Sequence, residues 1–149
     1  MSKFIPDLHD YSPYSSGDRD KDFNVVAIGW LSSEHPYNVG YVPSEFRTRL
    51  EIFCSDPLIM NFAVDICPIC QRLEAVTIEL SSGEKISLYG TYEIRIPSQD
   101  GKKVYAASDF IIHHVVVHHY KPPQEFIDSV LAAPLPGTPE FEAFAKPWK

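Results

Sequence analysis

Residues 110–120, FIIHHVVVHHY, hold four of the chain's six histidines among bulky apolar side chains. Any fold of this chain must accommodate these polar rings beside Ile and Val, so the segment constrains the fold more than any other. Three roles are open to such histidines. They can be metal ligands, proton-transfer groups, or packing residues with polar tips.

The residues that flank this segment favour a helix. Ser108 and Asp109 precede it and are good capping residues, and the double proline at 122–123 ends any helix that reaches it. We therefore predict a helix that carries the histidines. The Ile and Val residues favour a strand instead, and a strand would divide the four histidines between two opposite faces.

A second constraint comes from Cys67 and Cys70, which are separated by Pro-Ile. This spacing forms a tight turn that directs both thiolates toward one point, and a tetrahedral zinc ion then needs two more ligands. On an ideal helix His114 and His118 project about 40° apart, whereas His113 and His118 project about 140° apart. Ideal geometry therefore favours the first pair. A spacing of five residues still occurs in zinc fingers, where the ligands lie near the end of a helix.

The joint presence of the cysteine pair and the histidine segment predicts a Zn²⁺ site formed by Cys67, Cys70 and two histidines. Two alternatives remain open. The histidines can be buried and hydrogen-bonded to the backbone beside two ordinary core thiols. The cysteines can also form a glutaredoxin-type dithiol, although residues 71–75 are too few for the long helix of that fold. The role of Cys54 is left open.

Periodicity along the rest of the chain predicts an α+β fold. We expect a three- to four-stranded antiparallel meander, two to four short helices, and a zinc-finger-like Cys knuckle and helix. The expected strands are 25–31, 76–80, 86–96 and 104–107, and the other expected helices are 45–53 and 124–132. A single domain, 1–149, includes an irregular lead-in, 1–22, and a Pro-rich tail, 133–149, that packs on it.

The formal charge of −7 disfavours nucleic acid as a partner, because phosphate binding depends on clustered Lys and Arg. An acidic surface suits a basic protein partner. No apolar run is long enough to cross a membrane, and the N-terminus has no signal-peptide pattern, so we expect a cytoplasmic protein. The oligomeric state is left open.

No nucleophile elbow, phosphate loop or dinucleotide-binding motif is present in the sequence. If two Cys and two His complete the coordination sphere, the zinc is structural and the chain is a protein-binding module. An immunity-type protein that neutralises a basic toxin is one such class. The alternative is a zinc-dependent hydrolase with an open metal site. Its acid and base would be His114 or His119 and Asp65 or Glu93.

Several short segments together resemble a family of small uncharacterised bacterial proteins, over residues 5–132. They are NV at 24–25, GWL at 29–31, HPY at 35–37, G at 40, VP at 42–43, CPIC at 67–70, EIRI at 93–96, VYAA at 104–107, and the run from His113 and His118 to Tyr120, Pro122, Pro123 and Phe126. The resemblance implies no established activity.

The resemblance does imply which histidines bind the metal. The family has His where His113 and His118 stand, and Tyr and a small residue where His114 and His119 stand. The metal ligands implied are therefore Cys67, Cys70, His113 and His118, with His114 and His119 as packing or surface residues. Two segments depart from the family pattern. Residues 108–109 are Ser-Asp where the family often has Ala-Pro, and Asp65 stands where a His is common, which makes it a candidate to support a ligand.

Overall fold

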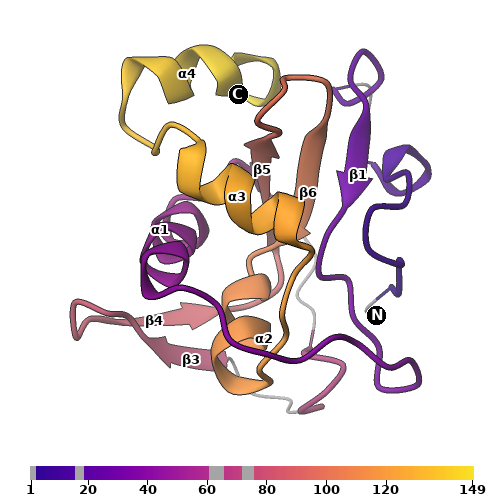
Figure 1. The fold of residues 1–149 in the computed structure, drawn as a ribbon, viewed down its shortest axis with the longest axis vertical. Helices are drawn as coiled ribbons and strands as arrows, with labels where there is room; N and C mark the ends of the chain where they lie inside the picture. Colours follow the sequence, from indigo (N-terminus) through magenta and orange to yellow (C-terminus); the bar gives the residue numbers. More distant parts are fainter. Residues whose placement is uncertain (1–2, 16–18, 61–65, 72–75) are drawn as a thin grey trace.

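A computed structural model describes residues 3–15, 19–60, 66–71 and 76–149 (Figure 1). Within these residues the α+β class predicted from the sequence is confirmed. The strands are β1 Val25–Ala27, β2 Ile59–Met60, β3 Val76–Glu79, β4 Lys85–Leu88, β5 Tyr92–Pro97 and β6 Val104–Ser108. The helices are α1 Ser44–Ser55, α2 Ile111–Val117, α3 Gln124–Ala132 and α4 Pro139–Ala145, with 3₁₀ turns η1 Ser12–Tyr14 and η2 Lys146–Trp148.

The main sheet has the strand order β1-β6-β5-β2. Strands β5 and β6 form an antiparallel pair joined by the turn at Ser98–Gly101, where the Gly101 N–H donates to the Ser98 carbonyl. Strand β2 extends the sheet antiparallel to β5, and β1 joins β6 in parallel. The parallel pair is possible because a long stretch of chain, including α1, separates β1 from β6.

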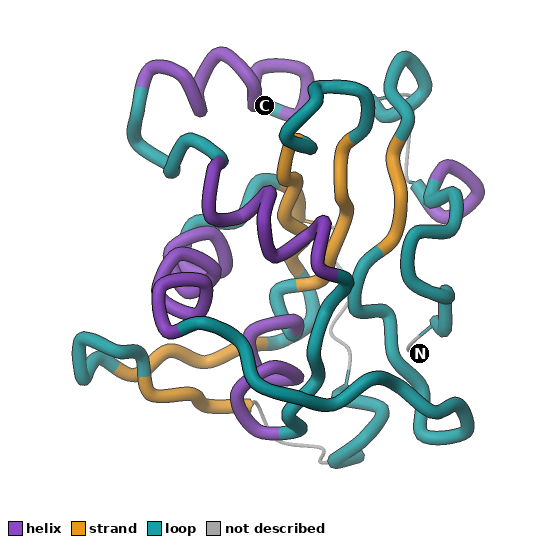
Figure 2. The backbone as a smooth tube through the Cα atoms, in the orientation of Figure 1, coloured by secondary structure: helices purple, strands orange, loops and turns teal. Residues whose placement is uncertain are grey.

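The predicted three-stranded meander is divided between two sheets. The segment 86–96 is not one strand but two, because the chain turns at Gly90, which has a φ of 67°. That left-handed conformation suits glycine and breaks the ladder. Within the described part of the chain, strand β4 therefore pairs with β3 and not with β5, and this hairpin lies apart from the main sheet (Figure 2).

Both faces of the main sheet are covered. Alternate residues of β1 and β6 belong to separate hydrophobic clusters, as expected because successive side chains of a strand point to opposite faces. One face packs against the helices. In Figure 1 α3 crosses in front of β5 and β6, and α1 contacts both α2 and α3. The other face packs against Ile5, Tyr11 and Trp148, which come from the two ends of the chain.

The second face also holds a buried ion cluster. The Arg95 guanidinium on β5 is 2% exposed and binds two carboxylates, Asp20 at 2.9 Å and Glu93 at 3.0 Å. The Trp148 indole N–H donates to the Asp20 carboxylate at 2.6 Å. Residues near both ends of the chain therefore meet at one strand of the sheet. Phe141 on α4 is buried as well, in the cluster on the helical face.

The predicted histidine helix is confirmed for Ile111–Val117, which form α2, but the helix ends before His118 and His119. Gly29 determines how closely α2 packs. Just before α2 begins, the Ser108 hydroxyl accepts a hydrogen bond from the Phe110 N–H. A Cβ atom on Gly29 would lie 3.1 Å from the Ile111 side chain at the start of α2. Because glycine has no Cβ, the chain after β1 can contact α2 directly. Among the described residues, no helix has the length and apolar character needed to cross a membrane.

Candidate metal centre

The cysteine pair lies in a tight turn between β2 and β3. The Gln71 N–H donates to the Cys67 carbonyl at 2.8 Å, and Gln71 itself adopts a left-handed φ of 56°. The backbone N–H groups of Cys70 and Ile69 point at the Cys67 sulfur. This turn holds both sulfurs on the side that faces α2, as the sequence predicts for Cys-x₂-Cys.

The two histidines come from the body and from the end of α2. His113 lies inside the helix, and His118 follows the last helical residue with non-helical dihedrals of φ −101° and ψ 5°. His119 then adopts a left-handed φ of 57°, a conformation typical of the residue that ends a helix. Because the helix stops at Val117, the ideal angular separation of about 140° between His113 and His118 no longer applies. Their rings turn toward the same point.

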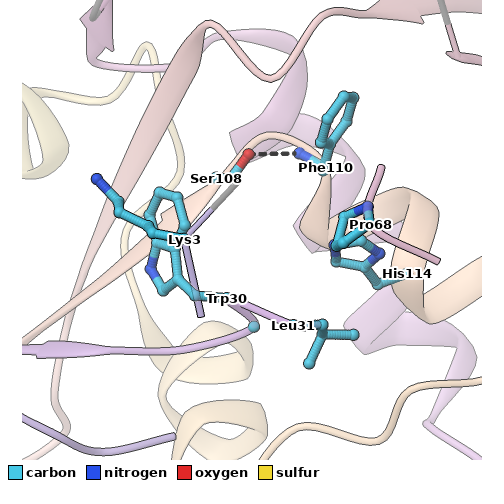
Figure 3. A pocket seen from close by; sticks show the side chains of 8 residues that line it. Lys3, Trp30, Leu31, Pro68, Ser108, Phe110 and His114 are labelled. Atoms are coloured by element: carbon cyan, nitrogen blue, oxygen red, sulfur yellow. Dashed lines mark hydrogen bonds between the residues drawn. The ribbon is translucent and has the colours of Figure 1, made fainter. Parts of the chain in front are cut away.

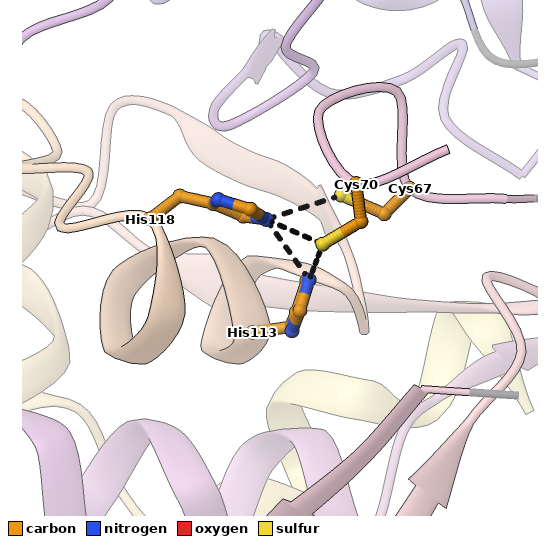
Figure 4. Close-up of side chains that lie close together, drawn as sticks. All are labelled: Cys67, Cys70, His113 and His118. Carbon is orange, nitrogen blue, oxygen red and sulfur yellow. Dashed lines mark hydrogen bonds between the residues drawn. The ribbon is translucent and has the colours of Figure 1, made fainter. Parts of the chain in front are cut away.

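The four side chains converge on one centre, with His113 projecting from α2 and His118 from the residue after it toward the cysteine turn (Figure 4). The His118 Nε2 atom lies 3.0 Å from Cys70 Sγ, 3.6 Å from Cys67 Sγ and 3.1 Å from His113 Nε2. Cys70 Sγ lies 3.3 Å from His113 Nε2, and all four ligand atoms are within 4.8 Å of one another. Ligand atoms around a tetrahedral zinc ion are about 3.3–3.8 Å apart. The cluster can therefore hold a metal ion.

Burial shifts the pKa of one imidazole and of one thiol of the centre. Cys67 and His113 are buried, whereas Cys70 and His118 are partly exposed. Burial, followed by the charge of His119, lowers the pKa of His118. Burial also raises the pKa of the Cys67 thiol, against the backbone hydrogen bonds to its sulfur. A neutral imidazole is the form that binds metals, whereas a buried thiol becomes a thiolate readily only beside a cation.

His114 also lies against the centre, whereas the family resemblance implied a packing or surface residue there. It is 2% exposed, and its Nδ1 atom lies 3.9 Å from Cys67 Sγ. Burial lowers the pKa of His114 to about 3, with smaller contributions from His113 and His118. His114 and Pro68 line a small pocket with Trp30 (Figure 3), whose volume of about 20 Å³ is enough for about one water molecule.

The other candidate residues lie outside the four-residue cluster. His119 is exposed, and Glu93 is bound to Arg95 in the ion cluster on the main sheet. Cys54 lies on α1 with its side chain in the core, where burial holds the pKa of its thiol well above the usual value. Asp65 lies outside the residues that the structure describes. Of the sequence-predicted candidates, Cys67, Cys70, His113 and His118 are thus the ones brought together.

Comparison with known proteins supports the expected family resemblance. The sequence model of one protein family, described as "Domain of unknown function (DUF7919)", matches residues 5–131. The predicted range was residues 5–132. The matched part includes both cysteines of the centre and the whole histidine segment. Neither the curated proteins nor the solved structures contain a match to this chain.

Proposed function

The chain belongs to the DUF7919 family, whose description names no activity, and we propose from its site that Cys67, Cys70, His113 and His118 bind one structural Zn²⁺ ion. The zinc would fasten the cysteine turn to α2. The observation that carries this proposal is the convergence of two sulfur and two imidazole nitrogen atoms within 4.8 Å.

The chemistry of these ligand atoms favours zinc over other metals. Two thiolates and two imidazoles form the Cys₂His₂ set typical of structural zinc sites, whereas Mg²⁺ and Ca²⁺ prefer oxygen ligands. The same geometry disfavours a dithiol redox site, because imidazole nitrogens surround the sulfurs at 3.0–3.6 Å. All three cysteines are free thiols, which suits a reducing compartment such as the cytoplasm.

A structural role fits better than a catalytic one. Four protein ligands fill a tetrahedral coordination sphere, so no position is left for a reactive water molecule. The centre joins a turn with little regular structure of its own to a short helix of seven residues, Ile111–Val117. Neither element would be stable alone, and a metal that binds both contributes its binding energy to folding.

We expect the purified chain to contain one zinc ion per molecule, measured by elemental mass spectrometry of the native protein. Two of its three thiols should be protected from a thiol reagent until a chelator is added, because Cys67 and Cys70 would be bound as thiolates. Cys54 is buried and should react only after denaturation.

His118→Ala should lose the zinc and the protection of both thiols, because it removes one of the four ligands. The matched control is His119→Ala, which changes the adjacent exposed histidine and should retain one zinc per chain. A native chain without metal and with both thiols freely reactive would contradict the proposed zinc site.

For the biological role we propose a small acidic module that binds a basic protein, of which an immunity-type protein facing a basic toxin is one instance. The net charge of −7 supports this proposal, and so does one surface feature. A groove of about 430 Å³ between α1 and the β3–β4 turn is lined by Glu51, Asp56 and Glu84. No Lys or Arg is among the described residues that line it. The exposed carboxylates of Asp56 and Glu84 would receive basic side chains.

Affinity capture from the native host, followed by mass spectrometry, tests this role. At low salt the native chain should retain a basic protein that the double variant Asp56→Lys, Glu84→Lys does not retain, because the carboxylates of the groove are then reversed in charge. The control Glu34→Lys, Glu140→Lys makes the same change in net charge at exposed sites elsewhere and should keep the partner. The proposal would be contradicted if both double variants lost the captured protein equally, or if the native chain captured no protein at all.

A further inference from the structure

The two sulfurs of the centre have different surroundings. Cys70 is partly exposed and lies 3.0–3.3 Å from the Nε2 atoms of His118 and His113. Cys67 is fully buried, and its nearest described ligand nitrogen, on His118, is at 3.6 Å. Water can therefore hydrogen-bond to Cys70 but not to Cys67. Any hydrogen bonds to the Cys67 sulfur must come from the protein.

The imidazole of His114 lies where it can form a hydrogen bond to the Cys67 sulfur. His114 precedes the last ligand by one helical turn, and its Nδ1 atom lies 3.9 Å from Cys67 Sγ. The backbone N–H groups of Cys70 and Ile69 approach the same sulfur from the cysteine turn. His114 adds a side-chain group from α2. It is 2% exposed, so its ring is held in place by the surrounding core.

Whether the Cys67 sulfur or the His114 imidazole donates the hydrogen bond depends on whether the metal is bound. A thiol can donate its proton to an imidazole nitrogen, but a metal-bound thiolate only accepts hydrogen bonds. A neutral imidazole has one N–H group, and the tautomer with the proton on Nδ1 directs that group at the sulfur. A hydrogen bond of this kind withdraws electron density from the thiolate, and such outer partners typically change metal affinity about 10–100-fold.

We propose that His114 is a positioning residue, whose Nδ1–H donates a hydrogen bond to the metal-bound thiolate of Cys67. This inference rests on the proposed zinc site and assigns a fifth side chain to it. His114 does not bind the metal. It compensates the charge of the buried sulfur, and it fixes the orientation of that sulfur toward His113 and His118.

Two variants separate this role from simple packing. His114→Asn keeps an N–H donor close to the position of Nδ1, whereas His114→Leu keeps the apolar volume and removes the donor. His119→Leu serves as a control at the exposed neighbour. The probes are Zn²⁺, whose affinity is measured by competition with a chromophoric chelator, and Co²⁺, whose absorption reports the ligands. The energy of the sulfur-to-cobalt charge-transfer band depends on the electron density at the thiolates.

We expect His114→Leu to bind Zn²⁺ about 10-fold more weakly than the native chain, and to shift the charge-transfer band to lower energy. His114→Asn and His119→Leu should stay close to the native chain in both measurements. The visible bands of tetrahedral Co²⁺ should persist in every variant, because no ligand is removed. If His114 only packed in the core, the Zn²⁺ affinity should instead fall more in His114→Asn than in His114→Leu, since a buried Asn is less favourable than a buried Leu.

Native affinity and native band energy in His114→Leu would overturn the inference and leave the zinc site intact. Equal shifts in the Asn and Leu variants would also overturn it, and so would loss of the tetrahedral bands in His114→Leu, which would make His114 a ligand. A native chain that takes up neither Zn²⁺ nor Co²⁺ would overturn the proposed function itself, and this inference with it.

Discussion

Chelation of the zinc should lower the free energy of unfolding by about 4 kcal/mol or more, since an ion present at about 1,000 times its Kd stabilises the folded state by that amount. The reason is structural. The metal would join the cysteine turn at residues 67–70 to α2, two segments that contribute little stability separately. For a chain of this size the thermal midpoint should fall by about 8–16 °C. Thermal unfolding followed by circular dichroism, with and without chelator, measures the effect.

Cysteine variants identify the residues responsible for this stabilisation. Cys70→Ser should unfold at nearly the same temperature with and without zinc, because it lacks one ligand. Cys54→Ala removes a buried thiol outside the centre and should be less stable than the native chain. Its response to zinc should nevertheless equal that of the native chain. A midpoint that chelation does not change in the native chain would contradict the predicted stabilisation.

Arg95→Met should lower the free energy of unfolding by about 3–5 kcal/mol, because it leaves two carboxylates in the interior without their cation. Arg95 is 2% exposed and binds Asp20 and Glu93 at 2.9 Å and 3.0 Å. Water cannot replace the guanidinium at such a buried position. Urea unfolding of the zinc-loaded protein measures the loss.

Arg47→Met is the matched control for Arg95→Met. Arg47 also binds a carboxylate, that of the buried Glu51, but the Arg47 side chain is 36% exposed. Glu51 also keeps hydrogen bonds from the Ser81 N–H and hydroxyl, so the variant should lose less than about 1 kcal/mol. Adding Glu93→Gln to Arg95→Met should recover part of the lost stability, because one uncompensated charge is then removed. Equal losses for Arg95→Met and Arg47→Met would show that the buried cluster contributes no more than the partly exposed pair of Arg47 and Glu51.

Local patterns in the sequence were sufficient to predict the α+β class, the cysteine turn and the histidine helix. The helix could be predicted because its flanking signals are local, with Ser108 and Asp109 before it and the double proline after it. Its exact limits could not, because α2 spans only Ile111–Val117 and no side chain caps its first turn. Its Ile and Val residues favour a strand, but burial against α1 and the chain after β1 outweighs that preference. Ideal helix geometry favoured His114 over His113, because it could not show that the helix ends at Val117. In the structure the four-residue cluster contains His113 and His118.

Features that depend on distant segments could not be predicted in this way. The division of 86–96 into β4 and β5 follows from the left-handed turn at Gly90, and the parallel pairing of β1 with β6 joins residues far apart in the chain. The alternation in residues 93–96 suggests a strand with one polar face in solvent. In the structure that polar face is covered by segments from both ends of the chain. Sequence periodicity does not show what covers a strand.

The indole of Trp148 bears on how the protein can be shortened in the laboratory. The family match ends at residue 131, yet Trp148 is 1% exposed and donates to the carboxylate of Asp20 that binds Arg95. A chain cut at the end of the match would admit water to that ion pair and remove Phe141 from the core. Shortened versions intended for crystallisation or partner screening therefore need to retain Trp148.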